Sequence, residues 1–224
     1  MKYSFIAILA LLFAACSAPP KQPAASDKPA AQTPLNPPEK PRVMSPEDSA
    51  KYLERGDDLV STSKQTISTA LVDAMEKGGV KYAAQFCNVA AYPIVDSLSR
   101  LNGARIRRVS DKPRNPKDAM DKEELKVFSF FKEKIKQPDA ELLPVVMQTN
   151  DSTVSYYSPI KISMPTCLKC HGEVGKEVKN EDYATLKKLY PDDNAVGYKQ
   201  GELRGMFSIR FEKSHPSLEK SSSN

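Results

Sequence analysis

The sequence predicts an α+β protein in which long helices come first and mostly antiparallel strands follow. Apolar residues recur with helical spacing between about residues 45 and 98. The turn signal Asn150-Asp151-Ser152 separates two stretches rich in strand-forming residues, 142–149 and 153–162. Residues 205–211 then alternate between polar and apolar side chains, as a strand with one buried face does. Helices and strands in separate runs are typical of the α+β class.

Length and composition limit the function classes. The 224 residues suffice for one domain with appendages, and 40% hydrophobic with 27% charged residues is typical of a folded chain. The net charge of +5 is too small, and the basic residues too scattered, to predict a nucleic-acid partner. Four cysteines are too few for a disulfide-built scaffold of this length.

Residues 1–15 predict a lipoprotein signal peptide. A basic start precedes a short apolar stretch that cannot span a membrane, and this stretch ends in Ala14-Ala15-Cys16, which resembles a bacterial lipobox. We expect Cys16 to be lipidated and to anchor the exported protein to the periplasmic face of a bacterial membrane. Ser17 is not Asp, which by resemblance to enteric sorting rules favours the outer membrane. An ordinary signal peptide cleaved near Ala15 or Ala18 is the alternative.

A proline-rich tether and a polar tail flank the expected domain. Residues 16–44 contain many prolines and no glycine, a composition that cannot bury a core and that predicts an extended spacer. The folded domain is expected over residues 45–211, and residues 212–224 form the tail.

The domain should begin with two helices. Ser45-Pro46 is a helix start, with an N-cap serine and a proline at the first helical position. This helix should end at Gly78-Gly79, and a second should start near Val80 with Cys87 on its apolar face. Pro93 should kink the second helix or begin a new one through Leu98.

Shorter elements are expected to follow. Residues 104–109 predict a strand, and residues 111–115 a polar loop. Residues 121–136 predict a helix with Leu125, Phe128 and Phe131 inward, and residues 182–189 predict another.

The residues that carry chemistry are Cys167-Leu168-Lys169-Cys170-His171, the C-x-x-C-H motif of c-type haem attachment. Two thiols on one helical turn can each add to a haem vinyl group, and the following histidine can then bind the iron. The motif therefore predicts one covalent haem c, with Cys167 and Cys170 as thioethers and His171 as proximal ligand.

Three other interpretations of the motif remain. A thioredoxin-like redox pair would not need the adjacent His171. A structural zinc site would need a fourth ligand, and no second C-x-x-C or C-x-x-H occurs. Coincidence is the third, and the predicted export weighs against it because haem c is attached outside the cytoplasm.

Several blocks of sequence resemble one family of exported haem proteins. They are Gln85-Phe86-Cys87-Asn88, Arg107-Arg108-Val109-Ser110, Arg114-Asn115-Pro116, Cys167 to Gly172, Tyr190-Pro191-Asp192-Asp193, Ala195, Gly197-Tyr198, Gly201 and Arg204-Gly205. The chain is thereby similar to single-haem c-type proteins with a PAS-like domain, long catalogued as a domain of unknown function. The resemblance implies a PAS-like antiparallel sheet with flanking helices, one covalent haem, and a role in redox sensing or electron transfer. In some members the second axial ligand is a cysteine thiolate.

Cys87 is the cysteine that neither lipid nor thioether accounts for. It is a candidate distal iron ligand, and the family resemblance around it favours that role; the alternative is an inert buried thiol. Rival distal ligands are Met164, Met147, Met206 and His215.

Arginines could pair with the haem propionates. Arg107, Arg108 and Arg114 are candidates because a guanidinium matches a carboxylate, and a solvated basic strand edge is the alternative. Tyr156-Tyr157 could line the haem pocket or pack in the core.

The resulting functional expectation is a membrane-tethered sensor of redox state or of a small ligand, acting through one His/Cys-ligated haem and an unknown redox or signalling partner. A periplasmic single-haem electron carrier is the alternative. An enzyme such as a peroxidase is the weakest interpretation, because the chain has only two histidines, so substrate turnover is not expected.

Overall fold

The computed structural model describes residues 44–213. Cys16 and His215, together with the predicted signal peptide, the tether up to residue 43 and most of the tail, lie outside the described residues, so the expectations for them remain predictions. No helix among the described residues is long and apolar enough to cross a membrane.

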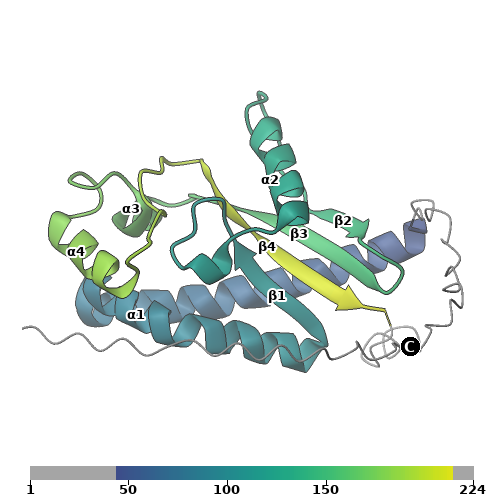
Figure 1. The fold of residues 1–224 in the computed structure, drawn as a ribbon, viewed down its shortest axis with the longest axis horizontal. Helices are drawn as coiled ribbons and strands as arrows, with labels where there is room; N and C mark the ends of the chain where they lie inside the picture. The colour runs from purple at the N-terminus through teal and green to yellow at the C-terminus, as the bar shows by residue number, and fades with distance from the viewer. Residues whose placement is uncertain (1–43, 214–224) are drawn as a thin grey trace, which may run out of the picture. The chain divides into compact units, whose positions relative to one another are not determined.

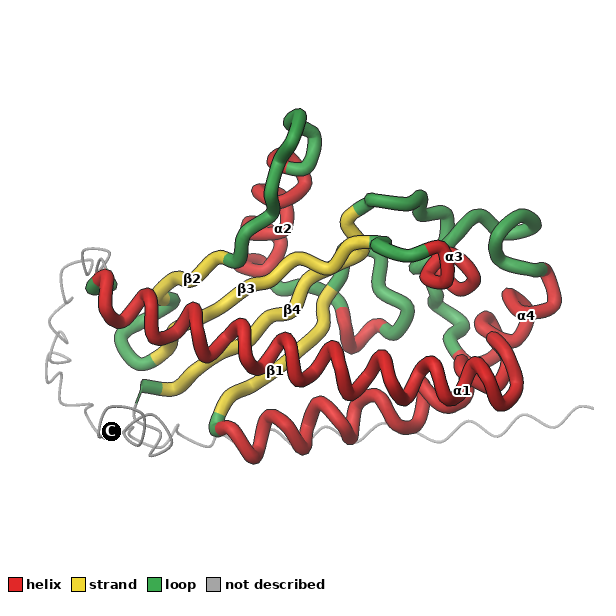
Figure 2. Tube along the Cα trace, turned by 180° about the vertical axis from the view of Figure 1, so that it is seen from behind, coloured by secondary structure: helices red, strands yellow, loops and turns green. Residues whose placement is uncertain are grey.

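The first element, α1 (Pro46–Asn102), is a pair of helices that fold back on each other. Ser45 caps its start by accepting a hydrogen bond from Asp48 N at 3.0 Å. The break lies at Gly78 and Gly79, and Gly79 has φ of +64°, which L side chains rarely adopt. The predicted end of the first helix at this glycine pair is confirmed, and both arms are visible in Figures 1 and 2.

A four-stranded antiparallel sheet follows, which confirms the predicted α+β class. The strands are β1 (Ala104–Val109), β2 (Val145–Gln148), β3 (Thr153–Lys161) and β4 (Leu203–Glu212), in the order β1-β4-β3-β2. The predicted bounds of β1 are confirmed, as is the hairpin between β2 and β3. Strand β1 is an edge strand of this sheet, and it begins two residues after α1 ends.

Helices cover both faces of the sheet (Figures 1 and 2). One face packs on α1 through a cluster that includes Tyr52, Val95, Ile106, Tyr156 and Phe211. The other face packs on α2 (Lys122–Lys134) through a cluster that includes Phe128, Phe131, Tyr157 and Met206. The short helices α3 (Pro165–His171) and α4 (Asn180–Leu189) lie in the connection between β3 and β4, and α4 contacts α1.

Two local expectations are wrong. No new helix begins at Pro93: α1 continues through this exposed proline to Asn102, and the non-helical backbone of α1 is confined to Gly78 and Gly79. Leu125 does not point inward: its side chain is 43% exposed, whereas Val127, Phe128 and Phe131 form the buried face of α2. The capping box between Asp121 and Glu124 fixes the start of α2 and thereby the face that it presents to the sheet.

Candidate functional site

Helix α3 carries the whole C-x-x-C-H motif, as the sequence predicts. Cys167 and Cys170 are half-buried free thiols one helical turn apart, and His171 is the last helical residue. Gly172 follows in a tight place, where a Cβ atom would lie 2.7 Å from the carbonyl oxygen of Leu168. The residue directly after the motif therefore has no room for a side chain.

The loop between α4 and β4 fixes the end of α3. Tyr198 N donates to the carbonyl of His171 at 2.9 Å, and Gly197 N donates to the carbonyl of Gly172 at 2.8 Å. Because both bonds are made by backbone groups, the helix end is held whatever the side chains do. The edge of the His171 ring faces Tyr198, with a centroid distance of 6.2 Å.

The imidazole of His171 is oriented by a backbone carbonyl. Its Nδ1 lies 2.7 Å from the oxygen of Ala195 and 3.3 Å from Nε of Arg204. A carbonyl only accepts and a guanidinium only donates, so Nδ1 cannot satisfy both. The shorter contact assigns the proton to Nδ1, which leaves the Nε2 lone pair available for a metal. Burial, and then the charges of Arg204 and Arg114, hold the pKa of His171 well below its usual range, which favours the neutral ligand form.

Arg114 joins the motif to two other segments. Its Nη2 donates to the carbonyl of Cys170 at 2.6 Å, and its Nε lies 3.2 Å from Oδ2 of Asp193. Asp193 is buried and also accepts from Ala195 N at 2.8 Å. This network positions the cysteine and, through Ala195, the histidine.

Cys87 is brought to the same region by the second arm of α1. This arm packs on α4 through Ala84 and Leu186. Cys87 is half-buried and close enough to Cys170 that its charge contributes to raising the pKa of Cys170, after the larger effect of burial. Burial likewise raises the pKa of the Cys87 thiol, and the positive charges of Arg108 and Arg114 oppose that rise. Two cysteines far apart in the sequence therefore share one electrostatic environment.

The structure does not bring Arg107 to this region. Its Nη1 lies 2.9 Å from both carboxylate oxygens of Glu124, whose side chain is fully buried, and its Nη2 donates to the carbonyls of Lys117 and Ala119. Arg107 thus holds α2 and the preceding loop to β1. Consecutive residues of a strand point to opposite faces, so Arg108 lies on the side of α1 and Arg107 on the side of α2.

The rival distal ligands are not gathered near His171 in the described residues. Met206 and Met147 belong to the core cluster under α2. Met164 precedes α3 and is 56% exposed. Tyr156 and Tyr157 are both fully buried in the two core clusters, where they pack as core residues.

Sequence reasoning missed Arg204 as a site residue. It is half-buried near the start of β4, and its Nη1 donates to Oγ of Ser110 at 2.7 Å. A charged residue at the start of an otherwise buried strand was the available signal. No group of three or more His, Cys, Asp or Glu among the described residues has the geometry to hold a metal ion, so the zinc interpretation gains no support.

We compared the chain with curated proteins, with solved structures and with protein-family models. No curated protein matches it. Among solved structures, the crystal structure of the cyanobacterial heme-protein Tll0287 matches with 21% identity and a TM-score of 0.50, covering 76% of this chain and 98% of that chain. At this identity the likeness shows a shared fold alone. The family model described as Tll0287-like matches residues 28–212, and the chain therefore belongs to the Tll0287-like family.

Proposed function

We propose that this protein carries one covalent haem c and acts as an exported, lipid-anchored sensor of redox state or of a small ligand. The observation that carries the proposal is the C-x-x-C-H motif on α3 with its oriented His171 imidazole, and the arm of α1 that bears Cys87 packs on the nearby α4. The family membership and the heme-protein of the same fold support it. We also propose that the four-stranded sheet is PAS-like, as the family resemblance implies.

The side chains fit the expected ligand set. Cys167 and Cys170 would form the two thioethers, His171 would bind the iron through Nε2, and Cys87 would be the candidate thiolate ligand. A bound haem would supply reversible one-electron chemistry. A thiolate donor stabilises ferric over ferrous iron, so the reduction potential should lie below that of a His/Met site.

One arginine is well placed for a propionate. Arg204 is half-buried beside His171, and no carboxylate among residues 44–213 lies within salt-bridge distance of it. A buried cation normally has an anionic partner. Arg114 already has Asp193, and Arg107 has Glu124. Arg204 is therefore the strongest candidate, with Arg108 as the remaining arginine of the sequence prediction.

An electron carrier is the second candidate function. No residue of α3 is fully buried, so the attachment helix lies at the surface of the described domain. A haem edge near the surface is what electron exchange with a partner protein requires. A low potential with slow, ligand-replacing binding of carbon monoxide would favour the sensor, whereas an inert six-coordinate iron with fast electron exchange would favour the carrier.

Attachment is tested by mass and by spectrum. Protein matured with a haem-attachment system should carry one haem in its intact mass. Cys167→Ala or Cys170→Ala should each remove one thioether and shift the reduced pyridine haemochrome band, and the double variant should hold no covalent haem. Wild-type protein without a haem adduct would overturn the proposal.

The anchor is tested separately. The lipobox-like Ala14-Ala15-Cys16 motivates it. Cys16→Ser should move the protein from the membrane fraction to the soluble periplasmic fraction. Unchanged fractionation would count against lipidation while leaving the haem proposal intact.

A further inference from the structure

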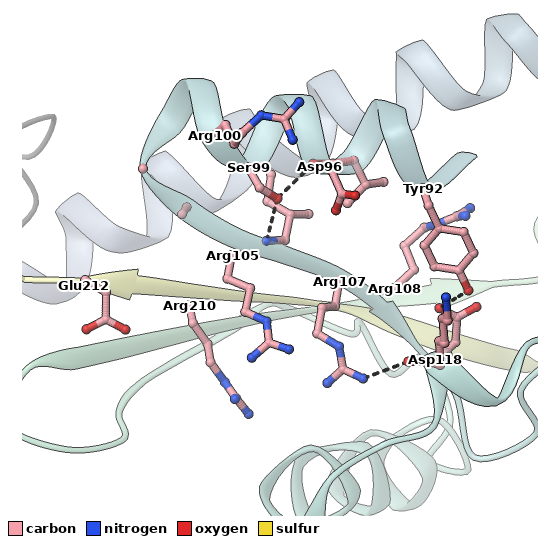
Figure 3. A pocket seen from close by; sticks show the side chains of 15 residues that line it. Tyr92, Asp96, Ser99, Arg100, Arg105, Arg107, Arg108, Asp118, Arg210 and Glu212 are labelled. Atoms are coloured by element: carbon pink, nitrogen blue, oxygen red, sulfur yellow. Dashed lines mark hydrogen bonds between the residues drawn. The ribbon is translucent and has the colours of Figure 1, made fainter. Parts of the chain in front are cut away.

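A pocket of about 650 Å³ lies between the last turns of α1 and the edge strand β1 (Figure 3). Its lining includes none of Cys87, Cys167, Cys170 or His171, so it is separate from the candidate haem site. The volume falls within the roughly 300–1,000 Å³ of ordinary small-molecule sites. Val95, Ala104 and Ile106 supply apolar surface to it.

Charged side chains surround this apolar surface. The cations are Arg100, Arg105, Arg107, Arg108, Lys117 and Arg210. The carboxylates are Asp96, Asp118 and Glu212. Positive charge is therefore in excess along the lining itself.

Ion pairing removes only part of this excess. Outside the lining, Glu124 binds Arg107, and Asp121 binds Arg210. Asp118 accepts a hydrogen bond from Oη of Tyr92 at 2.9 Å. In the described part of the chain, no carboxylate lies within salt-bridge distance of Arg100, Arg105, Arg108 or Lys117, and no cation lies within that distance of Asp96 or Glu212. Among the described residues of the lining, four cations without a carboxylate partner thus stand against three carboxylates without a cation partner, Asp96, Asp118 and Glu212, which leaves an excess of one positive charge.

The strand register adds like-charge repulsion. Arg105 of β1 stands directly opposite Arg210 of β4. Figure 3 shows both side chains and that of Arg107 extending from the same side of the sheet. Like charges directly opposite each other destabilise a strand pair; Asp121 offsets part of this cost at Arg210, and an anion bound at Arg105 would offset the rest.

The free edge of β1 is not open to another strand. Ile106 N donates to Oγ of Ser99 at 3.1 Å. Ser110, directly after the strand, donates through its N–H to the carbonyl of Asp118 at 3.0 Å. Two outward-facing donors of this edge are therefore already used, which favours an occupant held by side chains over an added strand.

We propose that this pocket binds a small organic anion with two or more carboxylate or phosphate groups, held by Arg105 and the neighbouring unpaired cations. Guanidinium groups recognise both anion types through paired N–H donors.

The pocket also borders the candidate haem site. Arg108 lines the pocket, and its charge reaches Cys87 and His171. Figure 3 places it beside Tyr92. An anion that binds near Arg108 would therefore change the electrostatic potential at the residues expected to hold iron. Binding itself does not depend on haem.

Isothermal titration of citrate into the full haem-loaded chain tests the proposal, with inorganic phosphate as a competing probe. Citrate should bind the wild type, and Arg105→Gln should weaken binding roughly tenfold or more because a charged hydrogen-bond donor is lost. Lys136→Gln is the matched control: it also removes one positive charge, but from an exposed pair with Glu133 on the far end of α2. That variant should bind citrate as the wild type does.

The two probes separate the possible anion sources. Displacement of citrate by phosphate would support a site shared by phosphates and carboxylates, and citrate binding that phosphate does not displace would support a polycarboxylate site. Absence of citrate binding to the wild type, or equal weakening in Arg105→Gln and Lys136→Gln, would overturn the proposal. Haem incorporation, read from the absorption spectrum of the same samples, tests the proposed function independently.

Discussion

The guanidinium of Arg204 lies against the imidazole of His171, with Nε 3.3 Å from Nδ1. Its Cζ also stands 5.4 Å from the ring centre of Tyr198. Burial lowers the pKa of Arg204. The group nevertheless remains a cation at neutral pH, because guanidinium titrates far above that range. A fixed positive charge therefore adjoins the expected proximal ligand.

Arg204→Gln should lower the reduction potential of the haem-loaded protein. Removing a positive charge beside the ligand stabilises ferric iron, the more positively charged state, over ferrous iron. Arg204→Lys should restore part of the potential because it keeps the charge. Lys188→Gln, an exposed change in α4, is the control and should leave the potential unchanged. Spectroelectrochemical titration measures all four proteins, and an unchanged potential in Arg204→Gln would reduce Arg204 to a packing role.

Arg107 should matter for stability and not for haem. Its partner Glu124 is fully buried, so Arg107→Ala leaves a buried carboxylate without its main counter-charge. Such a loss costs about 3–5 kcal/mol in a fully buried pair, and the partial exposure of Arg107 reduces this to about 2–3 kcal/mol. Urea unfolding measures the change, with Lys136→Ala as an exposed-pair control expected to cost under about 0.5 kcal/mol. Loss of the haem adduct in a folded Arg107→Ala variant would contradict this prediction, because it would show that Arg107 contributes to holding haem.

Much of the fold was predictable because its signals are local. The glycine pair at residues 78–79 and the turn at residues 150–152 each mark an element boundary by backbone chemistry alone. Leu125 was misplaced because the face that α2 buries is fixed by its capping box and by the sheet, and apolar spacing alone does not choose between faces.

The candidate site was predictable only where it is contiguous. The C-x-x-C-H motif specifies a helical turn by itself, and α3 confirms that turn. The roles of Arg107 and Arg204 could not be predicted in this way. Arg107 binds Glu124 of α2, whereas Arg204 lies beside His171. Which arginine reaches the motif depends on strand register and on the path of the loop before β4, and neither is encoded near the arginines.

Citrate should lower the haem reduction potential if both the haem and the anion pocket exist. An added negative charge near Arg108 stabilises ferric iron, and by linkage the ferric protein should then bind citrate more tightly than the ferrous protein by the same factor. Potentiometric titration with and without citrate measures the shift. Arg105→Gln should greatly reduce the shift at a citrate concentration near the wild-type Kd, where a tenfold weaker site is mostly empty. A potential that citrate does not move would show that the pocket and the iron are uncoupled.

Cys87 provides the most discriminating prediction, because its role separates the sensor from the carrier. If Cys87 is the distal ligand, the ferric wild type should show low-spin thiolate signals in absorption and paramagnetic resonance. Cys87→Ala and Cys87→Ser should lose these signals and raise the reduction potential, since a strong anionic donor to ferric iron is gone. Val89→Ala changes a residue of the same helix arm that is 73% exposed, so it is the control and should leave the spectra unchanged.

The opposite result for Cys87 is equally informative. The near-infrared band of methionine-ligated haem in the wild type, or a spectrum that Cys87→Ala leaves untouched, would make Cys87 a packing residue against α4. A methionine would then have to reach the iron, although Met206 and Met147 lie in the core under α2 and Met164 is exposed before α3. Such a ligand would require α3 or the strand ends to move, and it would raise the potential. The electron-carrier interpretation would then be preferred over sensing, because the thiolate ligand that favours a sensor would be absent.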